Sequence, residues 1–148
     1  MKHLFIALAL FVAGTFTPTA NANTGKTNPA VQQSFQNTFS GATDVEWTIS
    51  ENLYKASFTY NGQVVTAYYS TDGTQLALTK NISSDQLPIS LQAELKKHYD
   101  SYWVSNLFEM NDANGVSYYI TLETGESKLV LKSQSSFSWG VFQKTKKA

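Results

Sequence analysis

In the first half of the chain, hydrophobic positions repeat first with a helical period and then with a strand period. Val31, Phe35 and Phe39 are four residues apart, so they lie on one face of a helix. Asn28 and Pro29 suit the N-cap and the first turn of that helix. The pattern predicts an amphipathic helix of about three turns.

Alternating hydrophobic and polar residues follow this helix, and such alternation is typical of strands with one covered face. The dipeptides Asn61-Gly62 and Asp72-Gly73 separate the alternating segments, and both are strong signals for hairpin turns. We therefore predict an antiparallel meander of four strands, at residues 45–49, 54–60, 64–69 and 76–78.

The same order of elements then repeats. Leu87, Leu91, Leu95 and Tyr99 recur every four residues around Pro88, which predicts a second amphipathic helix. Further alternating segments, separated by turn residues, predict strands at residues 103–110, 116–123, 128–132 and 137–142.

Two helix-plus-meander repeats, residues 29–82 and 85–143, are thus predicted to form one domain. Its fold class is α+β: an antiparallel sheet of six to eight strands, with two helices on one face and the other face open. The pattern leaves open the strand register of the second repeat and whether both repeats share one continuous sheet. Residues 144–148, which include Lys144, Lys146 and Lys147, are predicted to form a solvated basic tail.

The start of the chain has the features of an export signal. Lys2 provides a positive charge, residues 4–16 are almost entirely hydrophobic, and residues 20–22 match the small-x-small pattern that a signal peptidase cleaves. We predict cleavage after Ala22, a flexible N-terminus at residues 23–28, and a periplasmic or secreted product. The hydrophobic stretch is shorter than the roughly 20 residues of a membrane-spanning helix. The chain has no cysteine to carry a lipid anchor.

A resemblance to a known family rests on several motifs in a fixed order. Residues 39–47 read Phe-Ser-Gly-Ala-Thr-Asp-Val-Glu-Trp, and residues 67–69, Ala-Tyr-Tyr, precede the Asp-Gly turn. Leu87-Pro88 then opens the second helix, and Tyr99 and Tyr102 form a Tyr-x-x-Tyr pair. Together these motifs resemble the PepSY-like, beta-lactamase-inhibitor-like periplasmic proteins found mainly in Bacteroidota. The similarity covers nearly all of the chain after the leader and is looser in the second half.

The resemblance implies a fold like that of the beta-lactamase inhibitor protein, in which helices pack on one face of an antiparallel sheet and the other face is open. It implies no catalytic residue. A PepSY-type domain would imply inhibition or regulation of a peptidase, by analogy of fold alone.

Composition and charge argue against nucleic-acid binding and metal chemistry. The chain has 11 basic residues, all lysine, and 11 acidic residues, so it lacks the basic footprint and the arginines of nucleic-acid-binding proteins. His98 is the only histidine after the predicted leader, and we expect it near the C-terminal end of the second helix, where the helix dipole favours it. Residues 112–115 lack the closing acid of a calcium loop and predict a turn. We predict neither a metal nor a cofactor.

We expect a protein without enzyme activity, because the sequence carries no catalytic constellation. It has no Gly-x-Ser-x-Gly motif that would place a nucleophilic serine. A hydrolase that uses paired carboxylates is a less favoured alternative. Its candidate acids in predicted strands are Asp44, Glu46, Glu109 and Glu123.

Aromatic residues carry the main functional signal of the sequence. They make up 14% of the chain, and several are neighbours in predicted strands: Tyr68-Tyr69, Tyr102-Trp103 and Tyr118-Tyr119. Adjacent residues of a strand point to opposite faces, so one ring of each pair is expected on the open face. Our candidate binding residues on that face are Tyr68, Tyr69, Trp103, Leu107, Tyr119, Lys128 and Lys132.

Strict alternation makes the expectation more specific. It places Trp103 and Leu107 on one face, and it points Tyr119 away from the helices beside Lys128 and Lys132. The register leaves undecided which of Tyr68 and Tyr69 points outward.

These features predict an exported, non-enzymatic binding module that engages another envelope protein, as an inhibitor or modulator, through the open aromatic face. The alternative is a periplasmic carrier or sensor whose rings stack on a small ligand, either a peptide or a sugar.

Overall fold

The computed structural model describes residues 27–148, and the predicted leader lies outside these residues. An antiparallel sheet of eight strands runs through the described part in sequence order. Its strands are β1 (Thr43–Ser50), β2 (Leu53–Tyr60), β3 (Gln63–Tyr69), β4 (Gln75–Asn81), β5 (Trp103–Asp112), β6 (Gly115–Glu123), β7 (Ser127–Ser133) and β8 (Trp139–Lys146). Because β4 pairs with β5, the two halves share one continuous sheet, and the predicted α+β class is confirmed.

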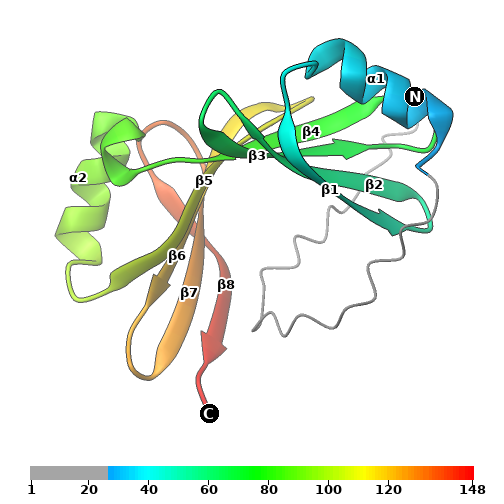
Figure 1. Ribbon diagram of the computed structural model, residues 1–148. Helices are drawn as coiled ribbons and strands as arrows, with labels where there is room; N and C mark the ends of the chain where they lie inside the picture. Colours follow the sequence, from blue (N-terminus) through cyan, green and yellow to red (C-terminus); the bar gives the residue numbers. More distant parts are fainter. Residues whose placement is uncertain (1–26) are drawn as a thin grey trace, which may run out of the picture.

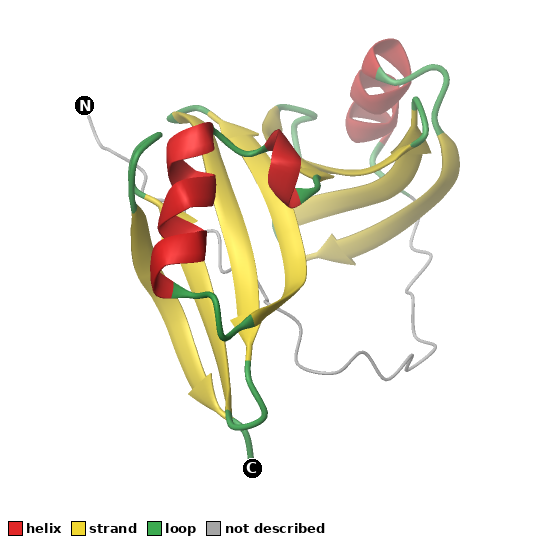
Figure 2. Ribbon diagram, turned by 90° about the vertical axis from the view of Figure 1, so that its left-hand side faces the viewer, coloured by secondary structure: helices red, strands yellow, loops and turns green. Residues whose placement is uncertain are grey.

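Two helices, α1 (Pro29–Thr38) and α2 (Ile89–His98), cover one face of this sheet, and a short 3-10 turn, η1 (Ser84–Gln86), precedes α2. In Figure 1 the sheet bends between β4 and β5, with both helices on its outer side. Figure 2 shows α2 lying over one face of the strands of the second half. The opposite face, which we call the open face, carries no described helix.

Local capping and turn chemistry explain where α1 begins and how it is held. The Asn28 side chain accepts a hydrogen bond from the Ala30 backbone N–H and donates one to the Thr71 carbonyl oxygen, both at 2.9 Å. Asn28 was predicted to belong to the flexible segment 23–28, yet these bonds fix it. Gly73, at φ +87°, lets the β3–β4 turn approach α1, because a Cβ there would lie 2.7 Å from the Ala30 carbonyl oxygen.

The core under α1 is rich in aromatic rings. Phe35 lies 5.0 Å from Phe58 between ring centroids and 5.3 Å from Trp47, in edge-to-face arrangements. The buried members of this cluster are Val31, Phe35, Phe39, Ala56, Phe58, Val65, Ala67 and Tyr69. These residues confirm the predicted helical face and the predicted alternation of β2 and β3.

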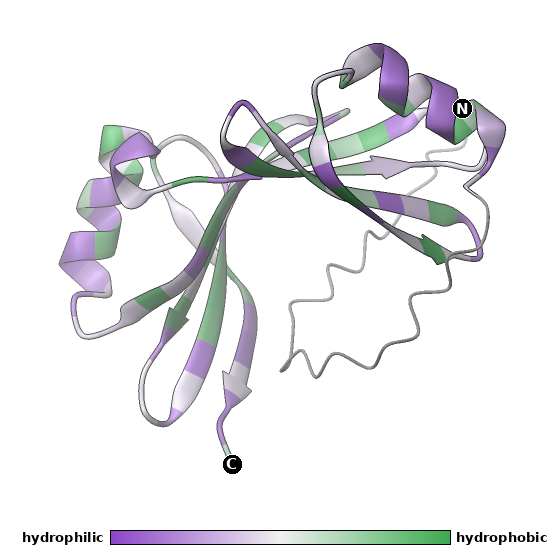
Figure 3. Cartoon of the chain, in the orientation of Figure 1, coloured by the Kyte–Doolittle hydropathy of each residue, from purple (hydrophilic) through white to green (hydrophobic). Residues whose placement is uncertain are grey.

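The core under α2 is aliphatic. Its buried cluster contains Leu87, Leu107, Ile120, Leu122, Leu129 and Leu131, and the fully buried Leu91 comes from α2 itself. Trp139 closes its edge, where the indole N–H donates to the Leu91 carbonyl oxygen at 3.1 Å. Figure 3 shows long hydrophobic stretches along β6 and β7, the strands that supply most of these residues.

The last strand differs from the sequence prediction at both ends. The prediction placed it at residues 137–142, followed by a tail at residues 144–148. Instead β8 begins at Trp139 and continues to Lys146, which pairs with Ser127 of β7. Backbone pairing to β7 therefore organises most of the segment that looked like a solvated tail.

Candidate binding surface

The open face of the second half carries a hydrophobic cluster of its own. Met110, Tyr119 and Val130 are buried there, and Phe108 packs against them. Phe108 and Tyr119 are cross-strand partners whose rings stack with centroids 5.1 Å apart and planes 9° apart. Such a ring pair fixes both side chains in one geometry.

Phe142 of β8 extends this cluster toward the sheet edge. Between β7 and β8 the register shifts, because Val130 pairs with Gln143 and Leu131 pairs with Val141, so Phe142 is an extra residue in a bulge. Its ring meets Tyr119 edge-on, with centroids 5.5 Å apart, and remains 45% exposed. The Lys132 ammonium lies 5.4 Å from the Tyr119 ring centroid.

Trp103 occupies the open face farther along the same strands. It pairs with Glu123, which lies four residues from Tyr119 on β6, so the two aromatic positions are about 13 Å apart along the sheet. Trp103 is 52% exposed. The Lys147 ammonium lies 4.8 Å from its ring centroid, a cation–π distance.

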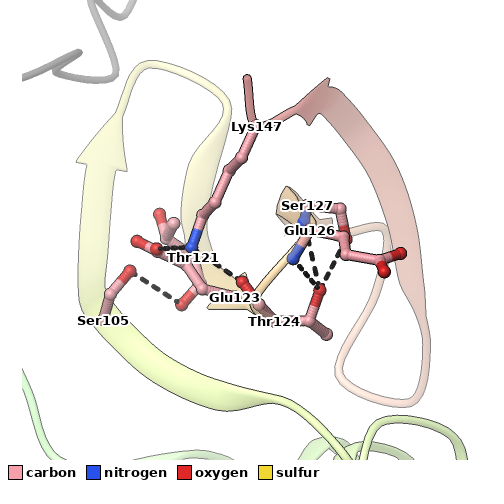
Figure 4. Close-up of polar contacts among 7 residues, drawn as sticks. All are labelled: Ser105, Thr121, Glu123, Thr124, Glu126, Ser127 and Lys147. Carbon is pink, nitrogen blue, oxygen red and sulfur yellow. Dashed lines mark hydrogen bonds and ion pairs between the residues drawn. The ribbon is translucent and has the colours of Figure 1, made fainter.

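Lys147 connects the end of the described chain to the end of β6 and the β6–β7 turn (Figure 4). Its ammonium is 2.7 Å from the Glu123 carboxylate and donates to the Thr124 carbonyl oxygen, also at 2.7 Å. Its backbone N–H donates to the Glu126 carbonyl oxygen at 2.8 Å. Hydrogen bonds from Lys147 and then from Ser105 hold the pKa of Glu123 below its ordinary value.

The β6–β7 turn is ordered by one hydroxyl, which explains why it can receive Lys147. Thr124 Oγ1 accepts hydrogen bonds from the backbone N–H groups of Glu126 at 3.2 Å and Ser127 at 3.1 Å. The turn therefore presents the Thr124 carbonyl oxygen in a fixed position toward the lysine (Figure 4).

Two of the candidate binding residues, Tyr69 and Leu107, lie on the helix-covered face instead of the open face. Both are buried, Tyr69 in the α1 core and Leu107 in the α2 core. The β5–β6 register shifts between Val104 and Asn106, so the extra residue reverses the alternation and separates Leu107 from Trp103. Burial raises the pKa of Tyr69 to about 12, and its hydroxyl has no hydrogen-bond partner among the described residues.

The other five candidates lie on the open face, but they differ in accessibility. Tyr119 points away from the helices and pairs with Lys132, as the alternation predicted, yet it is only 4% exposed. Tyr68 lies opposite Lys55, and burial raises the pKa of its hydroxyl. Lys128 pairs with Glu123 across β6 and β7, which places it on the open face. Trp103 is therefore the most accessible ring of the set.

Sequence reasoning missed five residues of this surface, and one of them is Phe108, which stacks on Tyr119. Met110 and Val130 complete the buried cluster, and Phe142 exposes a ring beside it. Lys147 was assigned to the tail. Of these last four, only Met110 and Val130 carried a usable signal, since each alternates with residues of the α2 core; the bulge that turns Phe142 toward Tyr119 has no recognisable sequence pattern.

The acids considered for a hydrolase do not form a pair in the second half. Glu109 and Glu123 point to opposite faces of the sheet, and each has its own lysine partner: Lys80 at 3.5 Å and Lys147 at 2.7 Å. His98 ends α2 and lies 3.4 Å from Glu94. Within residues 27–148, no three acidic or histidine side chains converge as metal ligands, and no helix there is long and apolar enough to span a bilayer.

Several solved structures share this architecture, whereas no family model and no curated protein matches the chain. A BLIP-like protein of Bacteroides fragilis aligns over 79% of this chain and 84% of its own, with a TM-score of 0.66 and 16% identity. The fold is BLIP-like. A DUF2874 family protein of Bacteroides ovatus aligns over 82% of this chain and 89% of its own, with a TM-score of 0.71 and 19% identity.

A third similar structure is named as a candidate periplasmic protein of Bacteroides eggerthii. It aligns over 82% of this chain and 90% of its own, with a TM-score of 0.72 and 15% identity. At these identities the likeness concerns the fold. The inhibitor-like part of the predicted resemblance is supported at that level, and the PepSY-like part stays a prediction.

Proposed function

We propose that this protein is a non-enzymatic binding module of the bacterial envelope, which engages another protein through the open face of its second half. The observation that carries the proposal is the placement of Trp103 and Phe142, two exposed rings on a sheet face without a described helix. Exposed aromatic rings on a rigid support are typical anchors of protein interfaces.

The arrangement favours a protein partner with a broad contact surface over a small ligand. The two anchors lie on β5 and β8, three strand spacings apart, which separates them by about 14 Å across the sheet. The buried side chains of Thr121 and Val130 lie between them, rather than a set of converging polar groups. The Tyr119 ring, itself stacked on Phe108, contacts the Phe142 ring edge-on and restricts it, so little side-chain entropy would be lost when a partner covers Phe142.

An envelope location and an inhibitory or modulating role belong to the same proposal. The predicted leader and the name of the Bacteroides eggerthii protein support the location. The name of the BLIP-like protein supports the role by analogy. The expected partner is an envelope enzyme whose activity changes when the open face is covered.

The proposal is tested with a double variant, Trp103→Ala with Phe142→Ala, in capture of proteins from a periplasmic extract of the native bacterium. A captured protein is then purified, and its binding to the wild type is measured directly. The matched control is Ile89→Ala with Val116→Ala, which removes two exposed apolar side chains from the helix-covered side. We expect the first variant to lose the partner and the control to keep it; retention by both variants would refute the open face as the interface.

A further inference from the structure

The strand β8 forms an edge of the sheet. It stands at the end of the strand order and, among the described strands, pairs with β7 alone. Every residue from Val141 to Lys146 is exposed. An edge strand carries backbone N–H and C=O groups that point away from the sheet, and these groups can pair with an added strand.

The opposite edge, β1, is much less suited to receive a strand. Its register shifts between Thr43 and Glu46, and Asp44 adopts a left-handed backbone conformation with φ +54°. Both features interrupt the row of edge hydrogen-bonding groups. β8 has a register shift as well, but no residue of β8 has a positive φ, and its residues from Gln143 to Lys146 form an uninterrupted ladder with β7.

The side chains of β8 define the chemistry that an added strand would meet. Val141, Lys144 and Lys146 pair with Leu131, Leu129 and Ser127, so all three point to the helix-covered side. Val141 is 64% exposed. Residues 127–148 contain five lysines and no acid, and no ion pair joins Lys144 or Lys146 to a carboxylate in the described part of the chain.

We propose that β8 is a strand-addition site for an extended segment of the partner protein, with carboxylates at alternate positions opposite Lys144 and Lys146 and an apolar residue opposite Val141. The inference rests on the proposed function and names the part of the partner that the edge recognises. Alternate residues of the added strand face the same side as the two lysines, which explains the required spacing.

The same lysines select against a second copy of β8. Two antiparallel β8 strands would bring ammonium groups close together on one face, and like charges opposite each other destabilise a strand pair. Phe142 points to the other face, so an added strand would extend the open face past this exposed ring. One partner segment could therefore pair with the edge while the rest of the partner covers Trp103.

The test uses the purified protein and a synthetic probe, a blocked peptide in which glutamate alternates with threonine and valine. Binding is measured by fluorescence anisotropy, and its place on the protein by residue-resolved amide hydrogen exchange. We expect exchange protection at β8 and, for the charge-reversal variant Lys144→Glu with Lys146→Glu, a loss of affinity of about tenfold or more. A peptide that alternates lysine with the same residues should not bind.

The matched control is Lys96→Glu with Lys97→Glu, which makes the same change of charge at exposed positions of α2. Equal binding by both double variants, protection away from β8, or self-association of the protein in place of peptide binding would overturn the inference. Binding of the captured partner to both variants distinguishes a failure of the strand-addition site from a failure of the proposed function. If the open-face variant loses that partner while the β8 charge-reversal variant keeps it, the binding surface stands and the strand-addition site fails.

Discussion

The two halves of the sheet share one architecture but place their buried aromatic rings on opposite faces. In the first half, Phe35 of α1 and the strand residues Phe58 and Tyr69 share the core between the helix and the sheet. The open face of this half carries hydroxyl groups, including Ser57 and Thr66, whose oxygens are 3.2 Å apart. In the second half, the buried residues under α2 are all aliphatic and the rings around them are only partly buried, whereas stacked or exposed rings occupy the open face.

This exchange shows that one supersecondary plan can supply two different surfaces. Burial under a helix can be achieved with rings or with leucines, since both remove apolar area from water. Because each half forms its helix-covered core on one face of the sheet, the residues on the open face can differ between the two halves. The surface that we propose for binding therefore lies in the second half, although each half contributes four strands to the sheet.

The largest expected effect comes from removing a ring of the first half. Phe58→Ala should lower the free energy of unfolding by about 3–5 kcal/mol, because Phe58 contacts both Phe35 and Phe39 of α1. Urea denaturation measures the loss. Thr59→Ala, on the other face of the same strand, should change stability by no more than about 0.5 kcal/mol. Similar losses for both variants would contradict the assigned faces.

A smaller loss of stability is expected when the buried Tyr119 ring is removed from the open face of the second half. Tyr119→Ala should cost about 2–3 kcal/mol, since the side chain is buried but lacks a helix above it. Tyr119→Phe keeps the stack on Phe108 and should stay close to the wild type. Thermal melts of both variants provide the measurement, and an unchanged melting temperature for Tyr119→Ala would remove this residue from the cluster.

The lysine at the end of the chain should have a pH-dependent effect. The pKa of Glu123 is lower in the folded protein than in the unfolded chain, so its ion pair stabilises the fold above the unfolded-state pKa. That contribution is lost as the pH falls through the folded-state pKa. Lys147→Met should therefore raise the Glu123 pKa in an NMR titration, and its stability deficit should shrink in acid. A deficit that grows in acid would contradict the ion pair.

The smallest effect is expected on the open face of the first half. Thr66→Val removes one hydroxyl of the Ser57 pair and should change the free energy of unfolding by about 0.5 kcal/mol or less. Partner binding, measured with the wild type beside it, should be unchanged. A marked loss of binding would extend the interaction surface into the first half and erase the contrast between the halves.

Sequence reasoning succeeded where local chemistry determines structure. Asn28 caps α1, and Asn61 and Gly62 adopt the positive φ angles that a tight hairpin turn needs. Val31 and Phe35 of α1 are buried between the helix and the sheet of the first half, as their spacing predicted. These features depend on residues close together in the chain, so the sequence alone carries the information.

The errors arose at irregular positions of strands. Strict alternation placed Leu107 with Trp103, but one extra residue near Ser105 reverses the faces. A second bulge turns Phe142 onto the open face, and pairing with β7 orders Lys144 and Lys146. Bulges and edge pairing depend on the neighbouring strand, which single-strand periodicity does not contain.

The strand order of the sheet also bears on how the chain acquires its structure. Each strand pairs with its neighbours in sequence, so apart from the β4–β5 connection, which carries α2, the loops that must close are short and their entropic cost is small. Low contact order favours fast folding for a protein with this much sheet. α1 and the strands β1 to β4 together contain the whole ring core of the first half, and β4 provides the edge that pairs with β5 of the second half.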